Sequence, residues 1–113
     1  DDSGKVFMLD SAGGAYEITL PTASSGEAGV YYKFIVEEET PTGAITLAAG
    51  SAIVSFVMKD AGGDASNSTA GTQVSNIVIG TSAQKADCVE LMFVGGEYVG
   101  SALSSINDAV TTS

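Results

Sequence analysis

The segment from Ala15 to Glu37, AYEITLPTASSGEAGVYYKFIVE, limits most strongly what this chain can fold into. Between residues 15 and 20 an apolar side chain alternates with a polar or small one, which is the period of a half-buried β-strand. Pro21 ends this strand because proline has no backbone N–H to contribute to a sheet. A second strand at residues 30–37 has one charged face, that of Lys33, and contains three of the eight Tyr and Phe side chains of the chain. The segment therefore predicts two strands that supply much of the aromatic core.

Comparable apolar runs, separated by turn-forming residues, continue along the rest of the sequence. We expect strands at residues 6–9, 15–20, 30–37, 44–48, 53–59, 74–79, 87–94 and 97–102. Gly95-Gly96 predicts a tight hairpin because glycine tolerates the positive φ of two-residue turns. Eight short strands without an amphipathic helix predict an all-β single domain, a β-sandwich or a jelly-roll-like barrel of antiparallel strands.

The domain is expected to occupy residues 1–102 of the 113-residue chain. Residues 103–113 show weak helical character at best, so they are expected to form a C-terminal tail or arm. Residues 59–72, KDAGGDASNSTAGT, have no hydrophobic periodicity and predict a long surface loop. The apolar run at 53–59 is expected to be buried on both faces or to lie at a subunit contact.

Charge excludes several classes of function. The chain has 14 acidic residues, four lysines, no arginine and no histidine, for a net charge of −10. Four scattered lysines cannot neutralise a row of phosphates, so nucleic acid is not an expected partner. The lack of histidine removes Ser-His-Asp and Cys-His catalysis, and the single cysteine removes an ordinary zinc site. No apolar run approaches the ~18 residues of a membrane helix. We expect no enzyme activity, no cofactor and no membrane contact.

Two groups of oxygen-bearing side chains could form a metal site or a catalytic site, and each also has a simpler interpretation. Asp60, Asp64 and Asn67 offer oxygen ligands to calcium, but their spacing matches no EF-hand loop, and a solvated loop is favoured. Glu17 and Glu90 are candidates for the paired acids of a glycosidase, although nothing in the sequence brings them together. Neither a metal site nor a catalytic site is predicted.

An excess of large apolar residues predicts a contact surface. The side chains expected to fill the core are Tyr32, Phe34, Val54 and Val57. Tyr31, Phe56 and Met58 then remain, and we expect some of them to face outward in a subunit contact. The alternative is that both sheets of a sandwich absorb all of them.

One run of acidic side chains and the single cysteine are the remaining candidates for a functional role. The run Glu37, Glu38 and Glu39 is a candidate hook for a basic patch on a partner. The commoner role of such a run is to keep a sheet edge from pairing with another chain. Cys88 has no neighbouring lysine or histidine motif and is expected to be a small buried hydrophobe.

Two stretches of the sequence resemble virion proteins of tailed bacteriophages. The first comprises DSGKVF at residues 2–7, ITLP at 18–21 and GVYYKFIV at 29–36. The second comprises DCVEL at 87–91 and GGEYVG at 95–100. They are similar to the opening and the closing hairpin of small β domains in phage head-decoration (cement) proteins and some fibre proteins. Tyr98 stands where a tryptophan is commoner in that hairpin.

The resemblance implies a non-enzymatic decoration protein on the outer surface of the virion head. Such a protein is expected to form a homotrimer and to tie neighbouring subunits of the major capsid protein together. The alternative is an adhesive module of a tail fibre that recognises host-surface glycans through residues 59–72. That stretch has no aromatic residue, which disfavours a carbohydrate platform. A hydrolase that uses carboxylates alone is the third hypothesis.

Overall fold

The computed structural model describes residues 4–21, 30–37, 42–59, 65–67, 74–94, 96–106 and 109–113. Every regular secondary-structure element within these ranges is a β-strand, which confirms the all-β prediction. The strands are β1 (Val6–Leu9), β2 (Tyr16–Thr19), β3 (Tyr31–Val36), β4 (Ile45–Lys59), β5 (Ala65–Asn67), β6 (Val74–Ile79), β7 (Cys88–Val94), β8 (Glu97–Leu103) and β9 (Val110–Thr112). In this described part of the chain no helix has the length and apolar character needed to cross a membrane.

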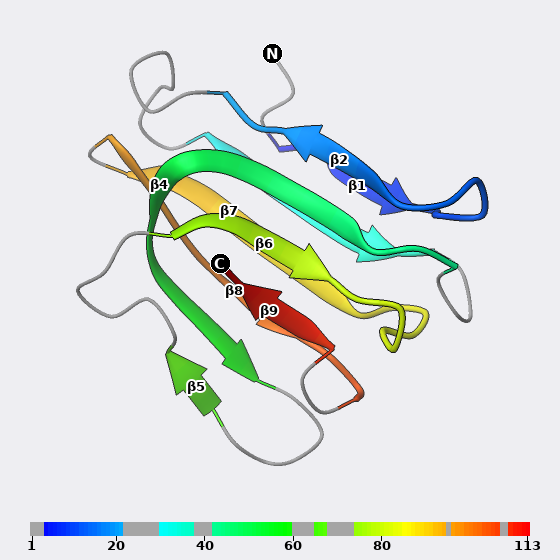
Figure 1. The fold of residues 1–113 in the computed structure, drawn as a ribbon. Coiled ribbons are helices and arrows are strands. Elements are labelled where there is room, and N and C mark those ends of the chain that lie inside the picture. Colours follow the sequence, from blue (N-terminus) through cyan, green and yellow to red (C-terminus); the bar gives the residue numbers. More distant parts are fainter. Residues whose placement is uncertain are drawn as a thin grey trace.

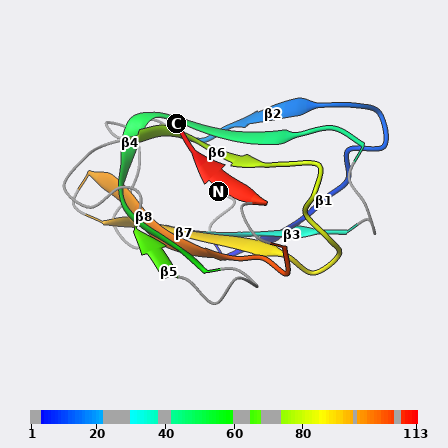
Figure 2. The same ribbon diagram turned by 60° about the horizontal axis from the view of Figure 1, so that its bottom comes forward.

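The strands form two layers that face each other (Figure 1, Figure 2). Hydrogen bonds connect them in the order β1-β3-β7-β8-β4-β6-β9, and β2 and β5 also pair with β4. We call the layer formed by β2, the first part of β4, β6 and β9 the β6 layer. The β7 layer is formed by β1, β3, β7, β8, the second part of β4, and β5. Strand β4 belongs to both because it curves from one layer into the other (Figure 2).

The bend in β4 replaces a turn that the sequence predicted at residues 49–51. The pairing of β4 with β6 shifts register between Ala48 and Ile53. Gly50 lies in this interval with φ +64°, a conformation that glycine adopts without steric cost. The chain therefore bends without ending its strand. The first half of β4 pairs with β2 and β6, and the second half pairs with β8 and β5.

The prediction of antiparallel strands is wrong for three pairs. β1–β3, β2–β4 and β4–β8 are parallel. The reason is that β1 and β2, β6 and β7, and β8 and β9 are consecutive strands in different layers. Neighbours within a layer therefore come from distant parts of the chain, and some run in the same direction. Strands β2 and β3, which the sequence placed together, lie in different layers and do not pair.

The C-terminal residues belong to the domain, which corrects the boundary expected at residue 102. Strand β8 continues to Leu103, and β9 pairs antiparallel with β6. Ala109 and Val110 are buried. A second correction concerns residues 59–72, where the three-residue strand β5 pairs with the end of β4.

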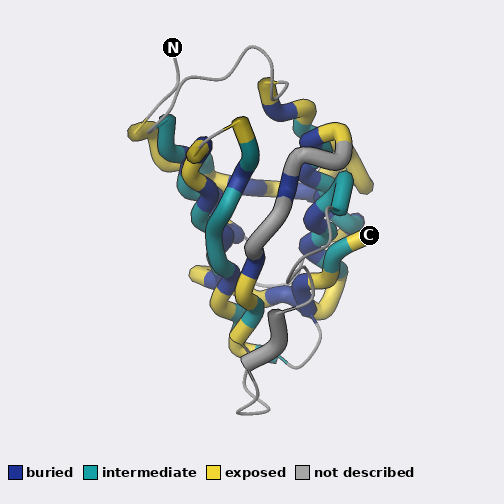
Figure 3. The backbone as a smooth tube through the Cα atoms, turned by 90° about the vertical axis from the view of Figure 1, so that its left-hand side faces the viewer, coloured by how far each residue is buried: buried dark blue, intermediate teal, exposed yellow. Residues whose placement is uncertain are grey.

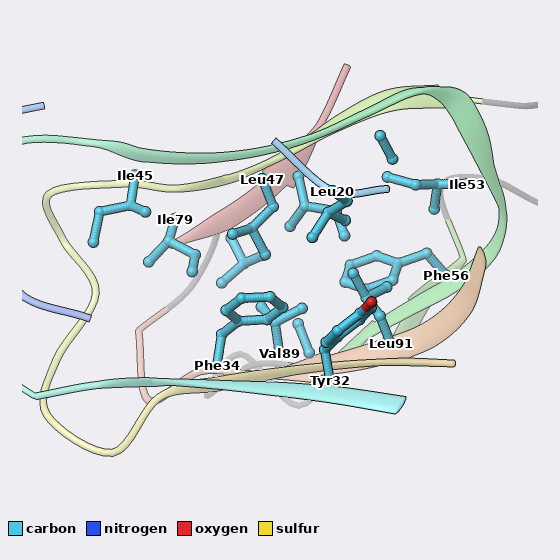
Figure 4. Packing of buried hydrophobic residues seen from close by; sticks show 14 of the residues in the cluster. Leu20, Tyr32, Phe34, Ile45, Leu47, Ile53, Phe56, Ile79, Val89 and Leu91 are labelled. Atoms are coloured by element: carbon cyan, nitrogen blue, oxygen red, sulfur yellow. The ribbon is translucent and has the colours of Figure 1, made fainter. Parts of the chain in front are cut away.

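The core lies between the two layers. Buried positions alternate with more exposed ones along the strands, as in β3 (Figure 3). Phe34 and Val89 of the β7 layer point toward Leu47 of the β6 layer (Figure 4). Tyr98 is buried and packs edge to face on Phe93, with 5.1 Å between ring centroids.

Candidate interaction face

The outer sides of the two layers differ in chemistry. On the β6 layer the outward positions are those that alternate with buried residues such as Ile45 and Leu47. We call this outer side the polar face, and its residues are Glu17, Thr19, Thr46, Ala48, Asn76, Val78 and Thr111. Polar and small side chains predominate there, as expected for a sheet that is solvated on one side.

The outer side of the β7 layer carries large apolar side chains. We call it the apolar face, and its apolar residues are Val6, Met8, Tyr31, Ile35, Val57, Cys88, Met92, Val94, Val99 and Leu103. Several are well exposed, including Met8 at 55% and Leu103 at 54%. Apolar side chains exposed singly are ordinary on protein surfaces, whereas contiguous ones mark a contact surface.

Strand register makes these side chains contiguous. One row crosses four strands through Met8, Ile35, Cys88 and Leu103. A second row crosses three strands through Tyr31, Met92 and Val99. Directly opposite residues in neighbouring strands have side chains in contact range. Each row is therefore contiguous, and the row between them has Lys33, Glu90 and Ser101 at its centre with Val6 and Val57 at its ends.

One ion pair lies between the two apolar rows. Lys33 and Glu90 are cross-strand partners, and the Lys33 Nζ is 3.2 Å from the Glu90 Oε1. The hydrogen bond with Glu90, and then its negative charge, raise the pKa of Lys33 above its ordinary value. Both side chains remain partly exposed. The centre of the face thus carries one charge of each sign.

The structure places only part of the predicted contact set on this face. Tyr31 is on it, directly opposite Met92. Phe56 is fully buried, and Met58 packs against the core from the same side of β4. Val57, which was expected to fill the core, is 40% exposed on the apolar face. The prediction had these neighbouring positions reversed, because a run that is apolar at nearly every position does not reveal which side faces inward.

The acidic run near β3 is described only at its first residue. Glu37 is exposed, and its backbone N–H donates a hydrogen bond to the Leu9 carbonyl oxygen at 2.9 Å. Glu38 and Glu39 lie outside the described residues. Their role in partner binding stays a prediction.

Of the two acid groups weighed as sites, the pair Glu17 and Glu90 lies in the described residues and does not form one. Glu17 is on the polar face and Glu90 on the apolar face, so these carboxylates lie on opposite outer sides and do not face each other. Asp60, Asp64 and the Asn67 side chain lie outside the described part of the chain. Among the described residues there is no group of three or more His, Cys, Asp or Glu that could hold a metal ion.

Cys88 is more exposed than the sequence predicted. It is partly exposed on the apolar face, between Ile35 and Leu103. Its cross-strand neighbours Ile35 and Leu103 are apolar, so it contributes a small hydrophobic side chain to the face.

Asp87 is a buried carboxylate with a structural role. Its Oδ2 accepts a hydrogen bond from the Gln84 N–H at 2.9 Å, and its Oδ1 accepts from the Ser105 N–H at 2.9 Å and the Ser105 Oγ at 3.0 Å. Gln84 lies in the β6–β7 connection and Ser105 in the β8–β9 connection. Asp87 therefore joins two segments that carry the chain between the layers.

Ser11 joins the β1–β2 connection to the β3–β4 connection in the same way. Its hydroxyl accepts a hydrogen bond from the Gly43 N–H at 3.1 Å, and its carbonyl oxygen accepts from the Thr42 hydroxyl at 3.0 Å. Ser11 and Asp87 are the buried polar side chains of the described residues. No buried side-chain polar atom in that part of the chain lacks a partner. Both residues fix the sandwich, which leaves the apolar face as the candidate functional surface.

Comparison with known proteins adds no relative. The chain matches no protein-family model, no curated protein and no solved structure. The resemblance to phage virion proteins therefore stays a prediction that rests on residues 2–36 and 87–100.

The sequence contains a signal for the apolar-face residues that the sequence analysis did not identify. Residues 6–9 read VFML and residues 88–94 read CVELMFV, so both sides of these strands are apolar except at Glu90. A strand with one solvated side alternates apolar and polar residues. Met8 and Met92 occupy outward positions where a solvated strand would have polar residues. Their apolar character indicates that this side of the strands contacts another surface.

Proposed function

We propose that this protein is a non-enzymatic decoration protein of a bacteriophage head, which binds the outer surface of the assembled shell and ties neighbouring major-capsid subunits together. The apolar face is the observation that carries the proposal, because a broad apolar surface on a two-layered sheet suits a protein that works by being held against other proteins. The sequence resemblance supplies the viral setting.

The mechanism proposed is mechanical and rests on mass action. A protein that binds the assembled lattice, and not the separate subunits, stabilises the lattice by an amount that grows with its concentration relative to its dissociation constant. The net charge of −10 resists association of free copies in unfavourable orientations before they dock. Glu37, Glu38 and Glu39 are the proposed contacts to a basic patch on the shell.

Binding to purified shells tests this function. Empty heads and unassembled capsid subunits of a phage whose genome encodes this sequence are mixed separately with the purified protein. We expect saturable binding to the heads and none to the free subunits, with regular density over the head in cryo-microscopy. Density confined to the tail would reject the proposal and would favour the adhesive, glycan-recognising alternative.

The acidic run provides a matched pair of variants for the same assay. Replacing Glu37, Glu38 and Glu39 by glutamine is expected to weaken binding to the heads and to reduce its dependence on salt, because the rim charges of an interface act over a screened distance. Glu17→Gln changes one charge on the polar face and serves as the control. Equal binding by all three proteins would remove the acidic run from the contact.

A further inference from the structure

We infer that the apolar face is a self-association surface, covered by the same face of a second copy of this chain about a two-fold axis. This contact goes beyond the proposed function because it does not depend on a viral partner. It covers the apolar face of free copies, and the dimer must open before that face can meet the shell. It follows from the chemistry, charge and size of the face.

The chemistry of the face is the first argument. Met8, Val94 and Leu103 are each 47% exposed or more, on strands whose inner sides already fill the core. The polar face of the same molecule has Glu17, Thr19 and Thr111 at its exposed positions. A chain that places polar residues where a sheet meets water, and apolar residues on the opposite outer side, has a partner for that side.

Charge identifies the partner as another copy. The chain carries a net charge of −10, so two copies repel each other in most orientations. In the middle of the outer side of the β7 layer, Lys33 and Lys59 balance Glu90 and Glu97. Asp10 and Glu37 follow β1 and β3 at one end of this side. Copies that approach through the middle of this side therefore meet less repulsion than the net charge of the whole chain implies.

The central ion pair makes the face complementary to itself. Lys33 and Glu90 lie side by side between the apolar rows. When a two-fold axis passes beside this pair, Lys33 of each copy meets Glu90 of the other, and both charges remain paired. A contact of this kind is isologous, which means that one patch serves both copies. Water is displaced from its surroundings, so the charges interact more strongly than they do on a free surface.

The size of the face fits a reversible dimer. Neighbouring strands lie about 4.8 Å apart and each residue advances about 3.3 Å, so β1, β3, β7, β8 and the end of β4 present a footprint of about 20 Å by 20 Å. Counted on both copies, this footprint is about 800 Å², below the roughly 1,200–2,000 Å² that stable specific interfaces bury and in the range of weak, transient contacts. We therefore expect folded monomers in equilibrium with dimers.

Stoichiometry separates this contact from the trimer that the sequence resemblance implies. An isologous contact is complete with two copies, so it predicts a mass of twice the 11.3 kDa protomer. Sedimentation velocity over a range of protein concentrations measures that mass directly. The wild-type chain is compared with Met92→Glu on the apolar face and Thr46→Glu on the polar face.

The two substitutions form a matched pair because each adds one acid in mid-strand. Met92 is 41% exposed, so glutamate can be accommodated in the monomer. We expect Met92→Glu to raise the dimer dissociation constant by at least about tenfold, because it buries an unpaired charge in the contact, and Thr46→Glu to leave it within about twofold. Thermal unfolding at low concentration checks that both variants fold.

A charge exchange tests the two-fold arrangement itself. Lys33→Glu and Glu90→Lys each place like charges across the axis, so each variant alone is expected to dimerise weakly. An equimolar mixture restores both cross-pairs and is expected to recover the wild-type dissociation constant within about threefold. A merely structural role of the Lys33–Glu90 pair does not predict recovery in the mixture.

Three outcomes overturn the inference. These are a wild-type mass of one copy at every concentration, equal effects of Met92→Glu and Thr46→Glu, or a mass of three copies. The result is independent of the shell-binding assay. A monomer that binds heads removes the self-association and leaves the proposed function standing, whereas a dimer that ignores heads does the opposite.

Discussion

The outer sides of the β6 layer and the β7 layer are built on the same kind of extended backbone and back onto the same core. On the β6 layer, where Ile45 and Leu47 point inward, the outward residues include Glu17, Thr19 and Thr46. On the β7 layer the outward residues include Met8, Met92 and Leu103. Strands of this sandwich therefore do not need apolar residues on their outer side to fold. The difference supports the proposal that the apolar face is a contact surface.

The largest expected effect tests which side of β4 supports the fold. Phe56→Ala is expected to lower the free energy of unfolding by about 3–5 kcal/mol, because it empties a fully buried position. Val57→Ala, one residue along and on the apolar face, is expected to cost less than about 1 kcal/mol. Urea unfolding of dilute protein measures both. Similar losses would mean that the apolar face contributes to the core of the monomer.

Alkaline unfolding tests the interior between the layers. Burial, and then the neighbouring Tyr32, raise the pKa of Tyr98 to about 12, above the value of 10.0 for an exposed tyrosine. The folded state therefore keeps a proton that the unfolded state releases. Stability is fully present below pH 10 and is lost as the pH rises from 10 to 12, by at most about 2.7 kcal/mol for two pKa units.

The Tyr98→Phe variant isolates this loss. It removes the ionising hydroxyl and also the hydrogen bond that the hydroxyl donates to the Pro21 carbonyl oxygen at 2.9 Å. We expect about 1 kcal/mol lower stability at pH 8 and a shallower decline above pH 10. Tyr31→Phe on the apolar face keeps the decline because Tyr98 remains. A decline of the same depth in Tyr98→Phe would contradict the assignment.

A smaller effect is expected where the chain crosses between the layers. Asp87→Asn keeps one carbonyl oxygen for Ser105 but turns an amide toward the Gln84 N–H, which then lacks an acceptor. The expected cost is about 1–3 kcal/mol. Ser105→Ala, which removes the contacts of the hydroxyl with Asp87 Oδ1 and Gln84 Oε1 and keeps the backbone bond, is expected to cost about 1 kcal/mol. Thermal unfolding ranks the two, and the reverse order would show that Asp87 does not hold the connections.

The smallest effects concern the outer sides themselves. Met92→Thr on the apolar face and Thr46→Val on the polar face are each expected to change the stability of dilute monomer by less than about 0.5 kcal/mol. Unfolding curves at low concentration measure this. At high concentration only Met92→Thr is expected to lower the midpoint, because only the apolar face is covered in the dimer.

The sequence predicted strand positions better than strand partners. Residues 30–36 and 88–94 are runs rich in β-branched and aromatic residues between turn-forming residues, so β3 and β7 were found nearly to the residue. Such runs do not encode which strands pair, so the parallel pairs and the separation of β2 from β3 were missed. Gly50 illustrates the same limit, because a glycine with positive φ permits either a turn or a bend.

The candidate surface was predicted only in part for a related reason. Tyr31 was identified because its strand has an obvious inner side, occupied by Tyr32 and Phe34. The side of β4 that faces inward depends on how the strand enters the β7 layer after its bend, which Phe56 and Val57 alone cannot reveal. Strand β9 was missed because three residues that pair with β6 carry too short a pattern.

The accessibility of Cys88 tests the central claim most directly. This free thiol lies on the apolar face, between Ile35 and Leu103. The rate of thiol labelling is measured as protein concentration rises, with a Thr111→Cys variant in a Cys88→Ser background as the probe of the polar face. We predict that labelling of Cys88 slows about tenfold when nine in ten copies are paired, while the Thr111 position keeps its rate. A Cys88 rate that is the same at every concentration would contradict a face covered by a second copy.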